Sequence, residues 1–192
     1  MARKTRRENP VGFYHFITRG VNKRKLFHQD KDFKKYLELV REYRDLLGIH
    51  IYHYCLMNNH VHILLKAGTM SALSQFGHFT HRRYAYYYCR TYDLSGQVFR
   101  RNFVSLPIAR DNYLLECGRY IERNPLKAKL VKNLEDYPYS SYAHYVEGKN
   151  DPLVTESPLF LTLAHTPLER KAVYRFYVTH TREQEMKTGP QT

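Results

Sequence analysis

Two histidines on one predicted strand are the first residues in this sequence that could do metal chemistry. His60 and His62 flank Val61 within a segment rich in β-forming residues. Side chains at positions i and i+2 of a strand point to the same face, so the two imidazoles could act together as metal ligands. Histidines near a hairpin turn are also common as solvent-facing or hydrogen-bonded side chains, and the pair alone leaves that alternative open.

A tyrosine and an asparagine four residues apart form the second candidate group. Tyr120 and Asn124 fall on a predicted helix, where that spacing places both side chains on one face. A tyrosine can serve as a covalent nucleophile, and an asparagine carbonyl can bind a hard cation. The alternative is that Tyr120 is a packing residue and that Asn124 caps the helix before Pro125.

The elements that must position these residues follow from hydrophobic periodicity and turn residues. The predicted strands are residues 12–18, 49–56, 60–66 and about 97–105. The predicted helices are residues 31–47, 70–91, 111–124, about 126–133 and 167–182. Residues 57–59 form a turn between two strands, Pro125 should end or kink its helix, and residues 137–160 are expected to be an extended connection. This order indicates an α+β fold with helices on one face of a small antiparallel sheet.

Composition limits the partner and the compartment. The 192 residues fit one domain, or one domain with a tail, and their net charge of +13 favours a polyanionic partner. Lys and Arg outnumber Asp and Glu by 13 to 5 in residues 1–44, whereas residues 151–192 carry 5 of each. We expect no membrane span, no secretory signal and, because the three cysteines lie far apart, no structural zinc. A cytoplasmic protein is the expectation.

Three sequence words extend this interpretation when they are taken together. They are Tyr14-His15-Phe16 with Thr18-Arg19-Gly20, then Met57-Asn58-Asn59-His60-Val61-His62-Ile63-Leu64, and then Arg119-Tyr120-Ile121-Glu122-Arg123-Asn124-Pro125. Their order resembles the single-tyrosine HUH transposases, and most closely the REP-associated tyrosine transposases and related insertion-sequence enzymes. The resemblance covers about residues 10–145. It implies a bacterial, nucleoid-associated protein with a ferredoxin-like or RRM-like antiparallel sheet of four to five strands, helices packed on it, and a C-terminal extension.

The resemblance also implies a mechanism and a set of site residues. His60 and His62 match the HUH motif and, with Asn124, would hold Mg²⁺ or Mn²⁺, while Tyr120 would be the nucleophile. The implied reaction cuts and rejoins single-stranded DNA near hairpin-forming, REP-like repeats through a 5′-phosphotyrosine. The first candidates for DNA contact are Arg19, Asn22, Lys23, Arg24 and Lys25, and the second are Arg82 and Arg83.

The organisation and the competing functions stay open at this stage. We expect a basic arm at 1–10, a transposase domain at 11–148 and an extension at 149–192, in a monomer or a homodimer. One alternative is a domesticated, non-catalytic DNA- or RNA-binding protein on the same fold. Another is a small metallohydrolase that uses His60 and His62 on a different substrate. The sequence identifies neither the DNA that is recognised nor the group that deprotonates Tyr120.

Overall fold

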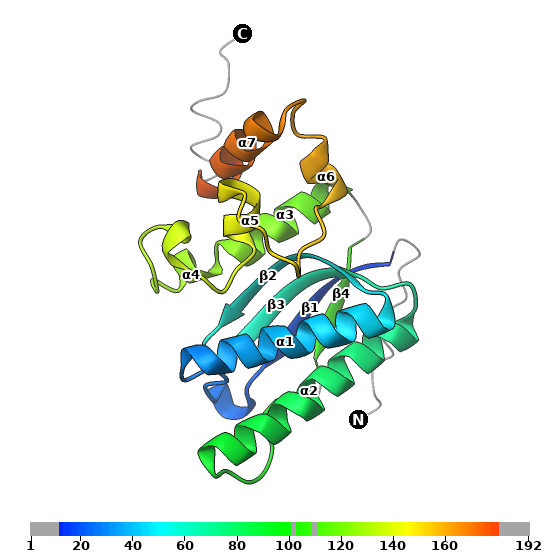
Figure 1. Cartoon of the computed structure of the whole chain (residues 1–192), viewed down its shortest axis with the longest axis vertical. Helices are drawn as coiled ribbons and strands as arrows, with labels where there is room; N and C mark the ends of the chain where they lie inside the picture. The colour runs from blue at the N-terminus through cyan, green and yellow to red at the C-terminus, as the bar shows by residue number, and fades with distance from the viewer. Residues whose placement is uncertain (1–11, 101–102, 109–110, 181–192) are drawn as a thin grey trace.

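A four-stranded antiparallel sheet forms the centre of the computed structural model, which describes residues 12–100, 103–108 and 111–180 (Figure 1). The predicted basic arm at residues 1–10 lies outside the described residues. The strands lie in the order β2-β3-β1-β4. They are β1 (Phe13–Arg19), β2 (His50–Met57), β3 (His60–Lys66) and β4 (Val104–Pro107). The two strands of the predicted hairpin are thus confirmed, and β3 has the predicted bounds.

Two long helices cover one face of the sheet. They are α1 (Asp30–Leu47) and α2 (Met70–Tyr92). Helix α1 begins with a reciprocal capping box between Gln29 and Asp32 and ends at Gly48, whose φ of 62° favours glycine. Apolar side chains of both helices pack on alternate residues of the strands, such as Val61, Ile63 and Leu65 of β3.

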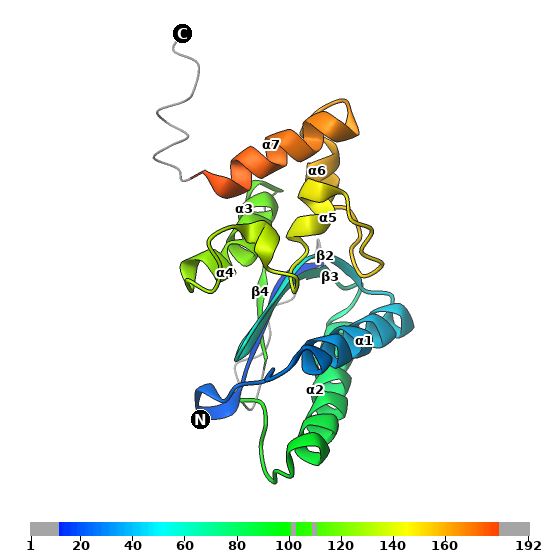
Figure 2. The same cartoon turned by 60° about the vertical axis from the view of Figure 1, so that its left-hand side comes forward.

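The opposite face of the sheet is also covered, as Figure 2 shows. The elements on this side are α3 (Asp111–Glu122), α4 (Asn124–Lys127), α5 (Tyr142–Glu147), α6 (Pro158–Leu161) and α7 (Pro167–Thr179). The prediction that helices lie on one face was therefore wrong. Strands β2 and β3 are buried almost continuously, because Cys55, Met57 and Leu64 pack under α3 on the second face.

Three predicted segments differ from the structure. The strand expected at about 97–105 is a four-residue strand at Val104–Pro107, although Phe99 forms an isolated bridge with Gly20. The helix expected at about 126–133 is the short α4, and residues 137–160 contain α5 and α6 instead of an extended connection. The extended connection was predicted from the prolines in this segment. Pro158 instead stands in the first turn of α6, where its missing N–H and fixed φ are compatible with a helix.

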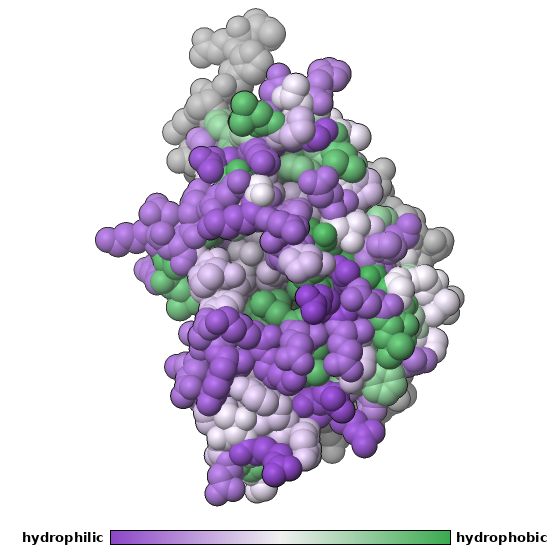
Figure 3. All heavy atoms as spheres, viewed as in Figure 1, coloured by the Kyte–Doolittle hydropathy of each residue, from purple (hydrophilic) through white to green (hydrophobic). Residues whose placement is uncertain are grey.

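The order β1-α1-β2-β3-α2-β4 with this strand order is the ferredoxin-like arrangement, so the predicted fold class is confirmed. Two short 3₁₀ turns, Val21–Lys23 and Leu134–Asp136, complete the elements. Figure 3 shows hydrophilic residues over most of the face seen in Figure 1, with hydrophobic residues in smaller patches. Within the described residues, no helix is both long and apolar enough to cross a membrane.

Candidate active site

The two central strands bring three histidines to the sheet face beneath α3. Strands β1 and β3 pair antiparallel, so Arg19 lies opposite His60 and Ile17 lies opposite His62. His60 and His62 share a face as predicted, with ring centroids 5.0 Å apart. His15, two residues before Ile17 on β1, joins them, and its ring centroid lies 5.0 Å from that of His62. The face therefore carries the pair His60 and His62 and one additional imidazole.

Hydrogen bonds define which nitrogen each histidine presents. His60 Nδ1 lies 2.7 Å from the Oδ1 oxygen of Asn59, which can only accept, so Nδ1 carries the proton. His62 Nδ1 lies 2.9 Å from His15 Nε2. If His62 Nδ1 donates to His15, the Nε2 atoms of His60 and His62 are both unprotonated and each offers a lone pair. A ring nitrogen held by such a bond is typical of metal-ligating histidines.

Burial keeps these imidazoles neutral. Burial first, and then the neighbouring His15 and His60, lower the pKa of His62 to about 2, and burial lowers the pKa of His15 to about 4. The pKa of His60 is also lowered, first by burial and then by the charge of Arg19. Neutral imidazole is the form that binds metal ions, so the site is ready to bind at neutral pH.

Tyr120 projects from α3 next to the histidines. Its ring centroid lies 5.8 Å from that of His62 and 6.0 Å from that of His15, both edge-on, and the side chain is 44% exposed. The Nζ atom of Lys127 lies 4.3 Å from the centre of the Tyr120 ring. The pKa of Lys127 is lowered by burial and by the cations Arg123 and Arg119. A cation thus stands beside a tyrosine that substrate can reach.

Asn124 lies where the helix is interrupted. Helix α3 ends at Glu122 and α4 begins at Asn124, with Pro125 in its first turn, which confirms the predicted break. The Nδ2 group of Asn124 donates to the carbonyls of Tyr120 and Ile121 at 2.8 and 3.0 Å. Because these bonds use the amide N–H groups, Oδ1 is the atom that Asn124 can offer to a cation.

These donors fit a divalent metal of modest affinity. Two imidazole nitrogens and one amide oxygen are suitable ligands, but none of them neutralises the charge of the ion. In the described part of the chain, no three His, Cys, Asp or Glu side chains form a group that could hold a metal ion. A site of this composition would gain affinity when an anionic substrate oxygen completes the shell.

A buried polar cluster fixes α3 on the sheet. The carboxyl group of Glu122 accepts hydrogen bonds from Ser141 Oγ at 2.6 Å, Tyr174 Oη at 2.8 Å and His53 Nδ1 at 3.0 Å. Glu122 and His53 are fully buried. The His53 ring packs against Gly118, where a Cβ atom would come within 2.8 Å of it. Strand β2, helix α3 and helix α7 therefore meet at one carboxyl group two residues from Tyr120.

A basic groove lies at the C-terminal end of β1, beside Arg19 and His60. It has a volume of about 560 Å³, and its lining residues are Arg19, Gly20, Val21, Asn22, Lys23, Asn59, His60 and Arg100. The segment that follows the lining loop is bonded to α2, because Tyr88 and Tyr84 donate to the carbonyls of Lys25 and Leu26. Asn22 and Lys23 have positive φ angles of 47° and 61°.

The structure places the residues predicted to contact DNA in two separate regions. It brings Arg19, Asn22 and Lys23 to the groove beside His60, and Arg24 and Lys25 continue the same loop. Arg82 and Arg83 are exposed on α2, which covers the opposite face of the sheet from α3, so the structure does not bring them to Tyr120.

Sequence reasoning missed His15, Lys127 and Glu122. His15 could have been found from strand parity, because it lies an even number of residues from Arg19 and therefore faces the same side of β1. Lys127 and Glu122 gave no such signal. Their positions depend on the helix break at residue 123 and on the packing of α7.

Comparison with known proteins agrees with this fold. The family profile described as "Transposase IS200 like" matches residues 12–124, which is more than half of the chain. The chain belongs to the IS200-like transposase family. No curated protein sequence matches it.

Two solved structures align with this chain. One, described as a REP-associated tyrosine transposase bound to a REP hairpin, aligns with a TM-score of 0.61 at 16% identity over 83% of this chain and 93% of that one. The other, a putative transposase from Deinococcus radiodurans R1, aligns with a TM-score of 0.44 at 17% identity over 64% and 97% of the two chains. At this identity the first likeness supports the fold.

Proposed function

We propose that this transposase cuts and rejoins single-stranded DNA with Tyr120 as its nucleophile. The observation that carries the proposal is the position of Tyr120, exposed and edge-on to His62 on the face that holds the HUH pair. The family and the fold make DNA strand transfer the expected class of reaction, and the site supplies a nucleophile and metal ligands for it.

The metal would be held by three side chains. His60 and His62 through Nε2, and Asn124 through Oδ1, would bind Mg²⁺ or Mn²⁺. When bound, such an ion polarises the scissile phosphate and offsets the charge that develops on its oxygens.

The reaction that we propose conserves the phosphodiester. The Oη atom of Tyr120 attacks phosphorus, a Tyr–O–P bond forms, and the bond to the 3′ oxygen of the preceding nucleotide breaks. The Tyr120 hydroxyl gives its proton to water and the leaving oxygen takes one from water, so that it leaves as a 3′-hydroxyl. Attack by a 3′-hydroxyl on the phosphotyrosine reverses the step. The ammonium group of Lys127, 4.3 Å from the centre of the Tyr120 ring, would place a positive charge beside the scissile phosphate.

Hairpin-bearing single strands are the substrate that we propose. The structural neighbour is bound to a REP hairpin, and the groove at the end of β1 offers cations and backbone groups to a phosphate chain. Arg19 and Lys23 would hold phosphates there, while Asn22 and the rest of the loop would fix the register of the strand.

A covalent adduct is the direct test. The protein is incubated with Mn²⁺ and a pool of labelled hairpin oligonucleotides with randomised single-stranded flanks, and the products are resolved on a denaturing gel. We expect a protein–DNA adduct that is lost in Tyr120→Phe and kept in Tyr86→Phe, since Tyr86 is exposed on α2 across the sheet. An adduct that survives in Tyr120→Phe would remove Tyr120 from its assigned role.

The metal assignment has a separate test. We expect His60→Ala and His62→Ala to lose cleavage while they keep binding to the same hairpin, and His78→Ala, an exposed histidine on α2, to keep both. Calorimetry should show weak Mn²⁺ binding by the free protein and tighter binding with DNA. Tight binding without DNA would contradict the charge argument.

A non-catalytic nucleic-acid-binding protein on the same fold is the second candidate. The basic groove alone would serve that role, and hairpin binding without any adduct in the wild-type protein would favour it.

We also propose that the transposase domain at 11–148 and the extension at 149–192 act together in a monomer, because α7 of the same chain packs on α3. Sedimentation of the free and DNA-bound protein would test this.

A further inference from the structure

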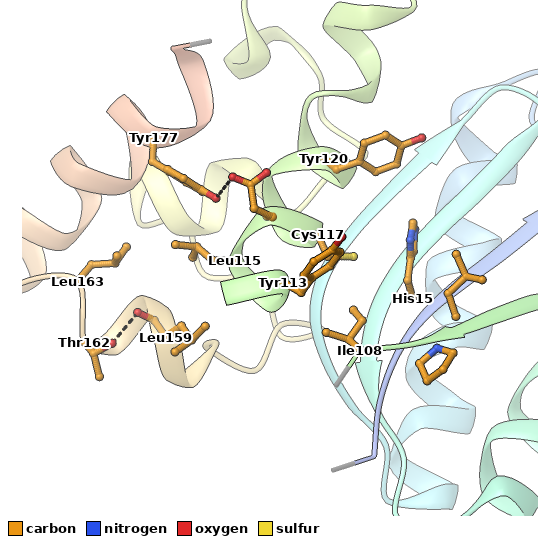
Figure 4. Close-up of a pocket in the computed structure, with 13 residues that line it drawn as sticks. His15, Ile108, Tyr113, Leu115, Cys117, Tyr120, Leu159, Thr162, Leu163 and Tyr177 are labelled. Carbon is orange, nitrogen blue, oxygen red and sulfur yellow. Dashed lines mark hydrogen bonds between the residues drawn. The ribbon is translucent and has the colours of Figure 1, made fainter. Parts of the chain in front are cut away.

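A second cavity lies beside Tyr120, on the side away from the basic groove. It has a volume of about 830 Å³ and is enclosed by β4, one face of α3 and the segment that contains α6 and α7 (Figure 4). His15 lines this cavity, and Arg19 lines the basic groove. These residues are four apart on the same face of β1, about 13 Å along the strand. Tyr120 and His62 stand next to His15, so a DNA strand lying across the site could reach both cavities.

One face of α3 provides two aromatic walls for the cavity. Tyr113, Glu116, Cys117 and Tyr120 follow the spacing i, i+3, i+4 and i+7, which places them on one side of the helix. Tyr113 is 67% exposed, and Tyr120 lies about 10.5 Å further along the helix. In Figure 4, Tyr113, Cys117 and Tyr120 lie on the part of α3 turned toward His15. Both tyrosine rings are therefore partly exposed and are not buried in the core.

The chemistry of the two cavities is opposite. The basic groove contains Arg19, Lys23 and Arg100, whereas no Lys or Arg is among the described residues that line the cavity beside Tyr120. Its remaining walls are mostly apolar, with Ile108, Leu159 and Leu163. Burial raises the pKa of the Cys117 thiol to about 12, so that this side chain is neutral as well. Arg119 lies close by but is paired with the carboxylate of Glu116, so the described lining offers mostly apolar and aromatic surface, which suits a flat group better than a phosphate.

One carboxylate is present at the wall. Glu116 is the only acidic residue among the described lining residues, and its side chain is 36% exposed. Tyr177 Oη of α7 donates to Glu116 Oε1 at 2.7 Å, as the dashed line in Figure 4 marks, and Arg119 Nη1 lies 3.5 Å from the same oxygen. These two contacts hold the carboxylate in place. A carboxylate accepts hydrogen bonds, and the amino groups of cytosine and adenine are donors on the edges of bases.

We infer that this cavity holds one unpaired nucleobase of the substrate strand, the base next to the scissile phosphate. The inference rests on the proposed function, because it places the base by its distance from Tyr120. The base stacks on Tyr113 and directs an amino group to Glu116, while the phosphates run toward the basic groove. Tyr113 and Glu116 are then specificity-determining residues.

The test combines a change in the protein with a change in the DNA. The probe is the hairpin strand recovered as the adduct from the randomised pool, remade with an abasic site on either side of the cut. For the wild-type protein we expect one of the two abasic strands to lose about tenfold in kcat/KM, the size typical of one stacked base. Tyr113→Ala should lose about tenfold on the intact strand and lose nothing further on that abasic strand.

Matched variants make the outcome specific. Tyr113→Phe keeps the ring and should behave as wild type, and so should Tyr86→Ala, which removes an exposed ring on α2. Glu116→Gln should reduce the preference for cytosine or adenine over thymine at that one position and leave other positions unchanged. Equal cleavage of both abasic strands and the intact strand would overturn the inference and leave the proposed function standing. Absence of an adduct with every strand would contradict the proposed function and this inference with it.

Discussion

At the scale of single residues, the site depends on histidines that stay neutral and oriented. His15 contributes to the neutrality and to the orientation of His62, because its Nε2 atom lies 2.9 Å from His62 Nδ1 and the two ring centroids are 5.0 Å apart. If His62 binds the metal as we propose, His15 would be a positioning residue for that ligand and would not need to touch the metal. Outer partners of this kind commonly change metal affinity or activity by 10–100-fold when they are removed.

We expect His15→Ala to lower Mn²⁺-dependent adduct formation by about 10–100-fold, because His62 loses the bond that holds its tautomer. The apparent Mn²⁺ concentration for half-maximal rate should rise. His15→Gln, which can still meet His62 Nδ1 with a hydrogen bond, should recover part of the loss. A fall in rate with an unchanged metal requirement would assign His15 to packing alone.

From strand parity the sequence predicted that His60 and His62 share a face, which is confirmed, whereas the roles of His60, His62, Tyr120 and Asn124 came from the family resemblance and stay predictions. Strand parity and helix spacing were enough to propose that His60 pairs with His62 and that Tyr120 shares a face with Asn124. The contacts of His15, Lys127 and Glu122 depend on how separate elements pack against one another. Spacing within one element carries no information about such contacts.

At the scale of elements, α3 is the part that the rest of the chain holds in place. It lies on β2 and β3, is ended by the break before Asn124, and is covered by α6 and α7. The sequence predicted this helix and its break because both are local signals. It did not predict α5 and α6, because short helices between prolines have little periodicity to detect.

Gly118 tests how closely α3 must approach the sheet. Glycine to alanine in a helix interior ordinarily stabilises by about 1 kcal/mol. At Gly118 the new Cβ would come within 2.8 Å of the His53 ring, which is fully buried and bonded to Glu122. We therefore expect Gly118→Ala to lower the free energy of unfolding measured with urea, and to slow cleavage because Tyr120 is displaced.

Gly68→Ala is the control for that substitution, since no atom lies within 4 Å of its added Cβ. It should change stability by less than about 0.5 kcal/mol. A Gly118→Ala variant that is more stable than the wild type would show that α3 can move away from β2 without cost.

Tyr174 tests the attachment of the C-terminal extension. Its hydroxyl group donates to the buried carboxyl of Glu122, so Tyr174→Phe should cost about 1.5–3 kcal/mol of unfolding free energy. Tyr142→Phe should cost less, because the Tyr142 hydroxyl group is 3.3 Å from Glu135, whose side chain is 36% exposed. If the two variants were equally stable, Glu122 would not be the main link between α7 and α3.

At the scale of the whole molecule, the cations predicted to contact DNA lie in two separate places, although the net charge of +13 counts them alike. Arg19, Lys23 and Arg100 line the groove next to His60, whereas Arg82 and Arg83 lie on α2 across the sheet. Composition predicts only that a polyanion binds. The fold separates the cations that can reach a strand at Tyr120 from those that cannot, and that separation was not visible in the sequence.

The salt dependence of DNA binding measures this division. For single strands, the logarithm of the binding constant falls with the logarithm of salt concentration by about 0.7 for each phosphate contact. With cleavage blocked by Tyr120→Phe, the double variant Arg19→Ala/Lys23→Ala should reduce that slope by about 1.4, because two contacts are lost. Arg82→Ala/Arg83→Ala should leave the slope unchanged while it removes the same amount of charge. Equal slopes in the two double variants would mean that net charge, and not its placement beside His60, governs binding. A change of slope only in Arg82→Ala/Arg83→Ala would place the strand on α2.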